Sequence, residues 1–222
     1  MNEKQFYSAL AAGVDQFGVN LSQPALSRLF TYYTELSRWS KKVNLISRSS
    51  SELEIVEKHF IDSLTLLPLL TEKSRLLDIG TGAGFPGLVC KAARTDLGLV
   101  MVEPRLKRVS FLRHIVRQLK LDEALVLAGR VEEKGLLDPF QQFSHITSRA
   151  VTEIGPFLTM CRPLAGKTSR IICMKGPRWE EELGRVDRKM LDSYKMEVMQ
   201  FVLPLSGAER TLLIFSTPAI AG

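Results

Sequence analysis

The fold is set by residues 77–87, which read LDIGTGAGFPG. A short apolar run leads directly into four glycines, and an amphipathic stretch follows. A strand that runs into glycines and then into a helix lets backbone amides approach a ligand at the carboxyl edge of a sheet. The same residues also match G-x-G-x-x-G, the dinucleotide-binding fingerprint. The run therefore predicts a ligand site, but its glycines alone do not identify the ligand.

Downstream of this loop, short apolar runs alternate with amphipathic stretches, a pattern typical of βα units that build a parallel sheet. We expect strands at residues 76–79, 99–102, 124–127, 145–147 and 170–174, with helices between them. Two further strands, 196–203 and 211–215, are joined by the short segment PLSG, which is too short for a parallel crossover. The sequence predicts an α/β fold with a seven-stranded, mostly parallel sheet whose last strand is reversed.

Residues 1–72 have helical rather than strand-like spacing of apolar residues. They predict a small helical N-terminal region, followed by an α/β domain over residues 73–222. Apolar residues recur at three- and four-residue spacing over residues 6–17 and again over residues 26–39. Ser51 and Glu54 have the spacing of a capping box at the start of a helix. We expect one more helix over about residues 57–70.

Composition narrows the class of protein. The chain has 222 residues with 45% apolar residues, and no apolar run approaches the ~20 residues that cross a bilayer. The N-terminus lacks a basic segment followed by an apolar one, so a cytoplasmic protein with no membrane partner is expected. The three cysteines form no C-x-x-C pair and the three histidines lie far apart, which predicts neither a disulfide nor a metal site. The net charge is +6, and the whole excess lies in residues 75–222.

Three acids near the predicted strand ends favour S-adenosylmethionine over a nicotinamide dinucleotide as the cofactor. Asp78 precedes Gly80 by two residues, where a carboxylate can bind the ammonium of a methionine moiety but would repel a pyrophosphate. Glu103 ends the second strand and is placed to accept both ribose hydroxyls; Glu132 follows the third strand, where an adenine would lie. These acids favour S-adenosylmethionine, although a nicotinamide-dependent oxidoreductase remains an alternative.

The segment after the fourth strand bears on the acceptor of a methyl group. It reads TSRAV over residues 147–151, with neither the N-P-P-aromatic loop of adenine amine methylation nor a cysteine nucleophile. Cys161 fits a small core residue in the next helix. Methylation of an acceptor with an available lone pair, such as guanine N7, requires neither this loop nor a cysteine. Many small-molecule methyltransferases also lack both features. Arg149 is the charged group at this strand end, and we interpret it as either a ligand contact or a surface ion pair.

A basic helix is predicted over residues 105–120. It has six bases and no acid, and the apolar residues Val109, Leu112, Val116 and Leu119 form a stripe on the opposite face. Such a basic face can contact nucleic-acid phosphates, with a solvated surface as the alternative.

Several blocks in the chain closely resemble those of the RsmG family, also called GidB. The blocks are residues 77–87 together with NL at 44–45, HFIDSL at 59–64, KRVSFL at 107–112, GRVEE at 129–133, SRA at 148–150 and KG at 175–176. The resemblance spans about residues 36–215. One departure is Trp39-Ser40, where the family often has Trp-Asn.

The resemblance implies a class I, Rossmann-like, S-adenosylmethionine-dependent methyltransferase. Its implied substrate is N7 of a guanine, guanine 527, in 16S ribosomal RNA of the small ribosomal subunit, and we expect it to act as a monomer. An RNA-binding assembly factor that transfers no methyl group remains an alternative. Our predicted cofactor contacts, from the residues and the resemblance together, are Asp78, Gly80, Gly82, Gly84, Phe85, Glu103, Val131 (through its backbone, beside the adenine), Glu132 and Arg149. Arg149 is also the candidate catalytic residue, and His59, Arg105 and Lys175 are the predicted RNA contacts.

Overall fold

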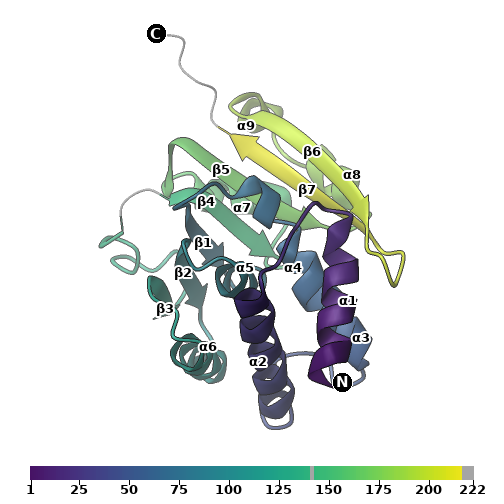
Figure 1. The fold of residues 1–222 in the computed structure, drawn as a ribbon. Coiled ribbons are helices and arrows are strands. Elements are labelled where there is room, and N and C mark those ends of the chain that lie inside the picture. The colour runs from purple at the N-terminus through teal and green to yellow at the C-terminus, as the bar shows by residue number, and fades with distance from the viewer. Residues whose placement is uncertain (141–142, 217–222) are drawn as a thin grey trace.

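The protein is built around one seven-stranded sheet. The computed structural model describes residues 1–140 and 143–216, and the strand order across the sheet is β3-β2-β1-β4-β5-β7-β6 (Figure 1). Strand β7 is antiparallel to both of its neighbours, whereas β1 to β5 pair in parallel. The predicted topology is therefore confirmed. The strands are β1 Arg75–Ile79, β2 Gly98–Glu103, β3 Ala124–Ala128, β4 Phe143–Arg149, β5 Ala165–Lys175, β6 Lys195–Val202 and β7 Glu209–Ser216.

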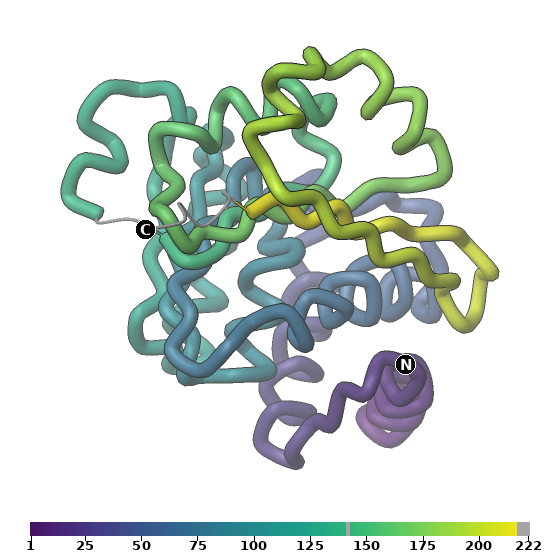
Figure 2. The backbone as a smooth tube through the Cα atoms, turned by 90° about the horizontal axis from the view of Figure 1, so that it is seen from above, coloured from purple at the N-terminus to yellow at the C-terminus, as the bar shows by residue number. Residues whose placement is uncertain are grey.

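Helices cover both faces of this sheet. One face carries α1 (Glu3–Asp15), α2 (Gln23–Ser40), α5 (Gly87–Ala93) and α6 (Leu106–Gln118). The other face carries α7 (Ile154–Cys161), α8 (Trp179–Gly184) and α9 (Arg188–Asp192). Figure 2, viewed from above, shows the purple N-terminal helices and the light-green α8–α9 segment on opposite sides of the β6–β7 pair.

Side-chain alternation along the strands divides the apolar residues into two cores. Leu76 and Met101 pack with the N-terminal helices, whereas their neighbours Leu77 and Val100 pack against α7. Parallel strands buried on both faces need apolar residues at nearly every position, as β1 and β2 have. The first core runs from Phe6 to Ile214, so the N-terminal helices share their core with the sheet. The division at residues 72 and 73 remains a prediction.

The segment between residues 52 and 69 differs from the single helix expected there. It consists of α3 (Glu52–Ile55), a π-helix η1 (Val56–Ile61), α4 (Asp62–Leu64) and a 3-10 turn η2 (Leu67–Leu69). The capping box at Ser51 and Glu54 is present and starts this segment. Pro68, which has no N–H and restricts the preceding residue, lies in the 3-10 turn and prevents the helix from continuing. In the π-helix, the Asp62 amide donates to the Glu57 carbonyl, five residues earlier.

Helix α6 carries the predicted amphipathic pattern. Val109 and Leu112 are buried against the sheet, and most of the bases from Arg105 to Lys120 face solvent. Within residues 1–140 and 143–216, no helix has both the length and the apolar composition that crossing a membrane requires.

Candidate functional site

A cleft of about 510 Å³ opens at the carboxyl ends of β1, β2 and β3. Strand order reverses between β1 and β4, and open α/β sheets bind ligands beside such a switch point. The volume lies within the usual range of small-ligand pockets, roughly 300–1,000 Å³. Of the predicted cofactor and RNA contacts, the cleft is lined by Gly80, Gly82, Phe85, Glu103, Val131, Glu132, Arg149, His59 and Arg105.

Asp78, a predicted cofactor contact, is not among the residues that line this cleft. Its side chain is fully buried, and its Oδ2 accepts hydrogen bonds from Thr81 Oγ1 at 2.6 Å and from the Gly87 amide at 2.8 Å. Burial raises the pKa of the Asp78 carboxyl to about 6. The carboxylate therefore connects the beginning of the glycine loop to the first turn of α5 and shapes the loop from behind.

Gly84 also lies outside the cleft lining, and its role is to admit a tyrosine. A Cβ at Gly84, whose φ is +100°, would lie 2.2 Å from the Tyr32 hydroxyl. That hydroxyl reaches past Gly84 and donates to the Ala83 carbonyl at 2.5 Å. Tyr32 belongs to α2, so the N-terminal region holds the glycine loop directly.

Glu103 connects the second strand to the glycine loop. Its Oε2 accepts from the Gly82 amide at 3.0 Å and its Oε1 accepts from the Arg105 amide at 2.9 Å. Arg108 lies nearby, with its Nη1 3.8 Å from Oε2. A carboxylate has about four acceptor positions, so both oxygens can still accept ribose hydroxyls.

Phe85 forms an aromatic floor where the cleft meets the N-terminal region. His59 stacks on its ring with centroids 4.6 Å apart, and Tyr32 stacks at 6.0 Å. The guanidinium carbon of Arg149 lies 5.0 Å from the centroid of the same ring. Cation–π attraction and stacking together fix the positions of His59 and Arg149.

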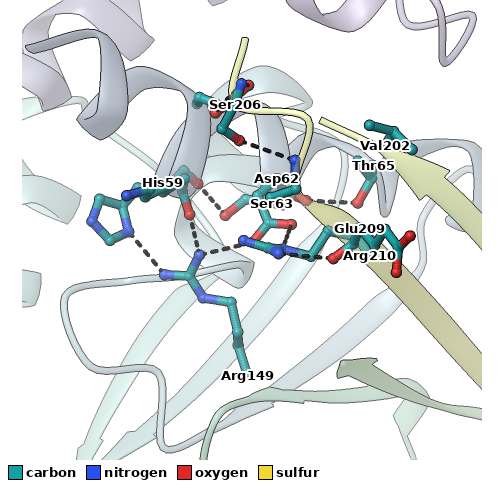
Figure 3. Close-up of polar contacts among 12 residues, drawn as sticks. His59, Asp62, Ser63, Thr65, Arg149, Val202, Ser206, Glu209 and Arg210 are labelled. Atoms are coloured by element: carbon teal, nitrogen blue, oxygen red, sulfur yellow. Dashed lines mark hydrogen bonds and ion pairs between the residues drawn. The ribbon is translucent and has the colours of Figure 1, made fainter. Parts of the chain in front are cut away.

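Arg149 is held by the segment around the π-helix, as Figure 3 shows. Its Nη1 donates to the Lys58 carbonyl at 2.5 Å and to Asp62 Oδ2 at 3.1 Å. The other oxygen of Asp62 accepts from Arg210 Nε at 3.2 Å. Because the π-helix shifts the hydrogen bond of the Asp62 amide to Glu57, the Lys58 carbonyl can serve the guanidinium instead. Of the two interpretations of Arg149, the structure shows a cleft residue that also forms an ion pair.

His59 is neutral in this arrangement. Arg149 Nη2 lies 3.1 Å from His59 Nδ1, and a guanidinium can only donate, so Nδ1 accepts and the ring proton is on Nε2. Burial, together with the charges of Arg149 and Lys58, lowers the pKa of His59 to about 3.

Lys175 lines a second cavity rather than the cleft. This cavity of about 650 Å³ lies beside the cleft, and the two share Arg149, Ala150 and Val151. Lys175 Nζ donates to Glu182 Oε2 at 2.6 Å and to the Thr152 carbonyl at 2.8 Å. Ala150 adopts a left-handed φ of +57°, an unusual backbone conformation for a residue with a Cβ and one that recurs at functional sites.

Other lining residues were not predicted from the sequence. Leu45, Thr81, Arg108, Val151 and Met160 line the cleft, and Glu182 lines the second cavity. Leu45, Thr81 and Arg108 lie in the family blocks, so the sequence did indicate their neighbourhood, whereas Met160 and Glu182 come from helices with no motif of their own.

Comparison with known proteins decides the family. The family model described as rRNA small subunit methyltransferase G matches residues 25–212. The chain belongs to this family. Ribosomal RNA small subunit methyltransferase G of Desulfotalea psychrophila is 51% identical over 211 residues, which cover 94% of this chain and 97% of that protein. The namesake protein of Syntrophotalea carbinolica is 37% identical over 90% of this chain and 92% of its own length.

Solved structures support the fold alone. An O-methyltransferase from Bacillus cereus superposes with a TM-score of 0.63 at 13% identity, covering 96% of this chain and all of that one. Membership in the methyltransferase G family and this fold confirm a class I methyltransferase with S-adenosylmethionine as cofactor. The cleft fits that cofactor because the glycine loop lines it without side chains at Gly80 and Gly82, because Glu103 places a carboxylate in it, and because it has the volume of a small-ligand pocket.

Proposed function

We propose that the protein transfers the methyl group of S-adenosylmethionine to N7 of a guanine in 16S ribosomal RNA, guanine 527 by family resemblance, within the small ribosomal subunit. The observation that carries the proposal is the position of Arg149, which lies between the cofactor cleft and the second cavity. A group at this boundary contacts both a bound cofactor and an acceptor. The protein acts as a cytoplasmic monomer in this proposal.

In the cofactor site, we assign the methionine end to the loop of Gly80 and Gly82, the ribose to Glu103, and the adenine to Val131 and Glu132. The order of these residues follows the order of strands β1, β2 and β3 along the cleft. When bound, the cofactor supplies a methyl group on a positively charged sulfur. Phe85 and Arg149 close the end of the cleft that faces the second cavity.

The residues around the two cavities suit an acceptor that already has a free lone pair. No cysteine is among the described residues that line either cavity. Cys161 is buried in α7, and burial raises the pKa of its thiol, so it stays protonated. Guanine N7 needs no deprotonation before attack, and alignment alone contributes a large part of the rate of such a displacement.

The RNA substrate is supported by charge and by the relatives. The proteins from Desulfotalea psychrophila and Syntrophotalea carbinolica are named ribosomal RNA small subunit methyltransferases. In this chain, Arg105 lines the cleft at the beginning of α6, and more bases follow along the exposed face of that helix. We propose that this face contacts phosphates beside the target nucleotide, which would make binding salt-dependent.

The test incubates the protein with methyl-labelled S-adenosylmethionine and small subunits that lack the modification, and then cleaves the RNA chemically at 7-methylguanosine. Cleavage at one guanine, dependent on the protein, is the expected result. Label in the RNA without such cleavage would reject guanine N7 as the acceptor, and binding to subunits without any transfer would favour the assembly-factor alternative.

A further inference from the structure

The second cavity has the position of an acceptor pocket. It lies at the carboxyl ends of β4 and β5, the same edge of the sheet as the cofactor cleft but on the other side of the switch point. Ligands of open α/β sheets occupy this edge. Arg149, Ala150 and Val151 line both cavities, so an acceptor here lies next to the cofactor.

The charged side chains in this pocket are not equally available to a ligand. Asp62 is almost fully buried between two guanidinium groups, with one oxygen bonded to Arg149 and the other to Arg210, so its charge is already compensated. The pair of Lys175 and Glu182 is different, because each partner keeps bonding capacity. Lys175 Nζ has three N–H groups, and two have acceptors among the described residues, Glu182 and the Thr152 carbonyl. Glu182 accepts from Lys175 through Oε2, and no hydrogen bond to its Oε1 occurs within the described part of the chain.

This pair is fixed and partly shielded from water. The Lys175 side chain is 12% exposed and that of Glu182 is 26% exposed. Lys175 ends β5, a central strand paired on both sides, and Glu182 lies in α8, which packs on the second core. A donor and an acceptor held side by side on ordered elements are suited to read one edge of a planar base, and partial burial strengthens each hydrogen bond.

We propose that Lys175 and Glu182 recognise the Watson–Crick edge of the target guanine, an inference that rests on the proposed function. Lys175 donates its remaining N–H to guanine O6, and Glu182 Oε1 accepts from guanine N1–H and from the 2-amino group. Bases that undergo chemistry in RNA are read this way when they leave their stack. N7 lies on another edge of the purine, so this recognition leaves its lone pair free for the methyl group.

The same pair rejects adenine. Adenine presents an amino donor at C6 and an acceptor at N1, which is the reverse of guanine. A bound adenine would therefore place its donor against the Lys175 ammonium and its acceptor against the Glu182 carboxylate. A polar site that is left unpaired by the wrong ligand discriminates strongly.

The experiment compares small subunits that carry guanosine or inosine at the target position, because inosine lacks only the 2-amino group. Wild-type protein and Glu182→Ala are measured on both substrates, with the cofactor affinity of each protein measured by calorimetry. We expect Glu182→Ala to lower kcat/KM on guanosine by about 10- to 100-fold with unchanged cofactor affinity. Inosine should lower the wild-type rate but should have a much smaller effect on the variant. The altered basicity of inosine N7 affects both proteins equally, so the ratio of the two effects isolates the contact.

Glu181→Ala is the matched control, because it removes the same charge from the exposed face of the same helix. It should keep the wild-type rate on both substrates. Should Glu182→Ala lose cofactor affinity, Glu182→Asp makes the same comparison with the charge retained. If the inosine effect is as large in the Glu182 variant as in the wild-type protein, the inference is overturned. Failure of the wild-type protein to methylate guanine would instead reject the proposed function, and this inference with it.

Discussion

Arg149 Nη1 and Asp62 Oδ2 lie 3.1 Å apart, although 87 positions separate the two residues in the sequence. The Asp62 side chain is only 3% exposed and is shared with Arg210. Removing the charge of a buried carboxylate leaves its cationic partners without compensation. The pair therefore fixes Arg149 at the boundary between the two cavities.

Replacing Asp62 with Asn should lower both stability and turnover. We expect the free energy of unfolding to fall by about 3 kcal/mol, measured by chemical denaturation. We expect kcat to fall more than tenfold with little change in the KM for S-adenosylmethionine, because Arg149 is displaced while the glycine loop is intact. Glu209→Gln, which removes a neighbouring exposed charge, is the control. An unchanged kcat in Asp62→Asn would show that Arg149 does not need this carboxylate.

Arg149→Lys tests the shape of the group rather than its charge. The guanidinium binds the Lys58 carbonyl, Asp62 and His59 at once and lies over Phe85, whereas an ammonium on a flexible stem cannot make all of these contacts. We expect kcat to fall by about tenfold or more, measured as methyl transfer to small subunits. A variant with full activity would mean that positive charge alone is sufficient.

Alanine substitutions at Gly82 and Gly84 should have different effects. Gly82 has a φ of +63°, and the nearest atom to an added Cβ is Arg108 Nη1 at 3.7 Å, so Gly82→Ala adds backbone strain without a clash. That strain costs roughly 1–2 kcal/mol and should weaken cofactor binding by about tenfold in calorimetry. Gly82→Val, with a β-branched side chain, should abolish binding, and unchanged affinity would reject the loop as the cofactor site.

Gly84→Ala should instead destabilise the fold, because the new Cβ would collide with the Tyr32 hydroxyl. Thermal unfolding should show a larger loss than for Gly82→Ala. Tyr32→Phe removes the hydroxyl that donates to the Ala83 carbonyl and should partly restore the stability of Gly84→Ala. If the double variant is no more stable than Gly84→Ala, the Tyr32 hydroxyl is not the main obstacle, and the clash with Leu88, whose Cβ would lie 2.9 Å from the new atom, dominates instead.

His59 should respond to pH in a defined window. Its pKa is lowered from 6.5 in the unfolded chain to about 3 in the folded protein, so the unfolded state binds more protons between these values. The contribution of His59 to stability is therefore complete above pH 6.5 and declines as the pH falls towards 3. His59→Gln should show a shallower decline in this window. NMR of the imidazole nitrogens should show a neutral ring at pH 5 in the wild-type protein; a ring that titrates near pH 6.5 would contradict the structure.

The sequence predicted the elements whose pattern is local. The strands, the reversed last strand and the glycine loop each follow from periodicity, glycine spacing or a short connection. The cofactor cleft followed too, because the carboxyl ends of parallel strands meet at one edge. Residue spacing could not show that the Asp78 side chain, near the end of β1, binds the first turn of α5, because this contact depends on how the helix packs against the strand.

Contacts between distant segments were the part that sequence did not reveal. Tyr32 binds the carbonyl of Ala83, 51 positions away, and nothing in the helix around it indicates this partner. The π-helix before Asp62 was also missed, because a shift of one residue in helix register leaves the apolar spacing nearly unchanged. Glu182 joined the second cavity only through the packing of α8.

The central claim is methyl transfer from the cleft to guanine N7, and nucleoside mass spectrometry tests it most directly. Unmodified small subunits would be incubated with the protein and S-adenosylmethionine that carries a trideuterated methyl group, and the 16S RNA would then be digested to nucleosides. We predict deuterated 7-methylguanosine with the wild-type protein and almost none with Gly82→Val. Deuterium in a different nucleoside, or equal labelling by both proteins, would contradict this account.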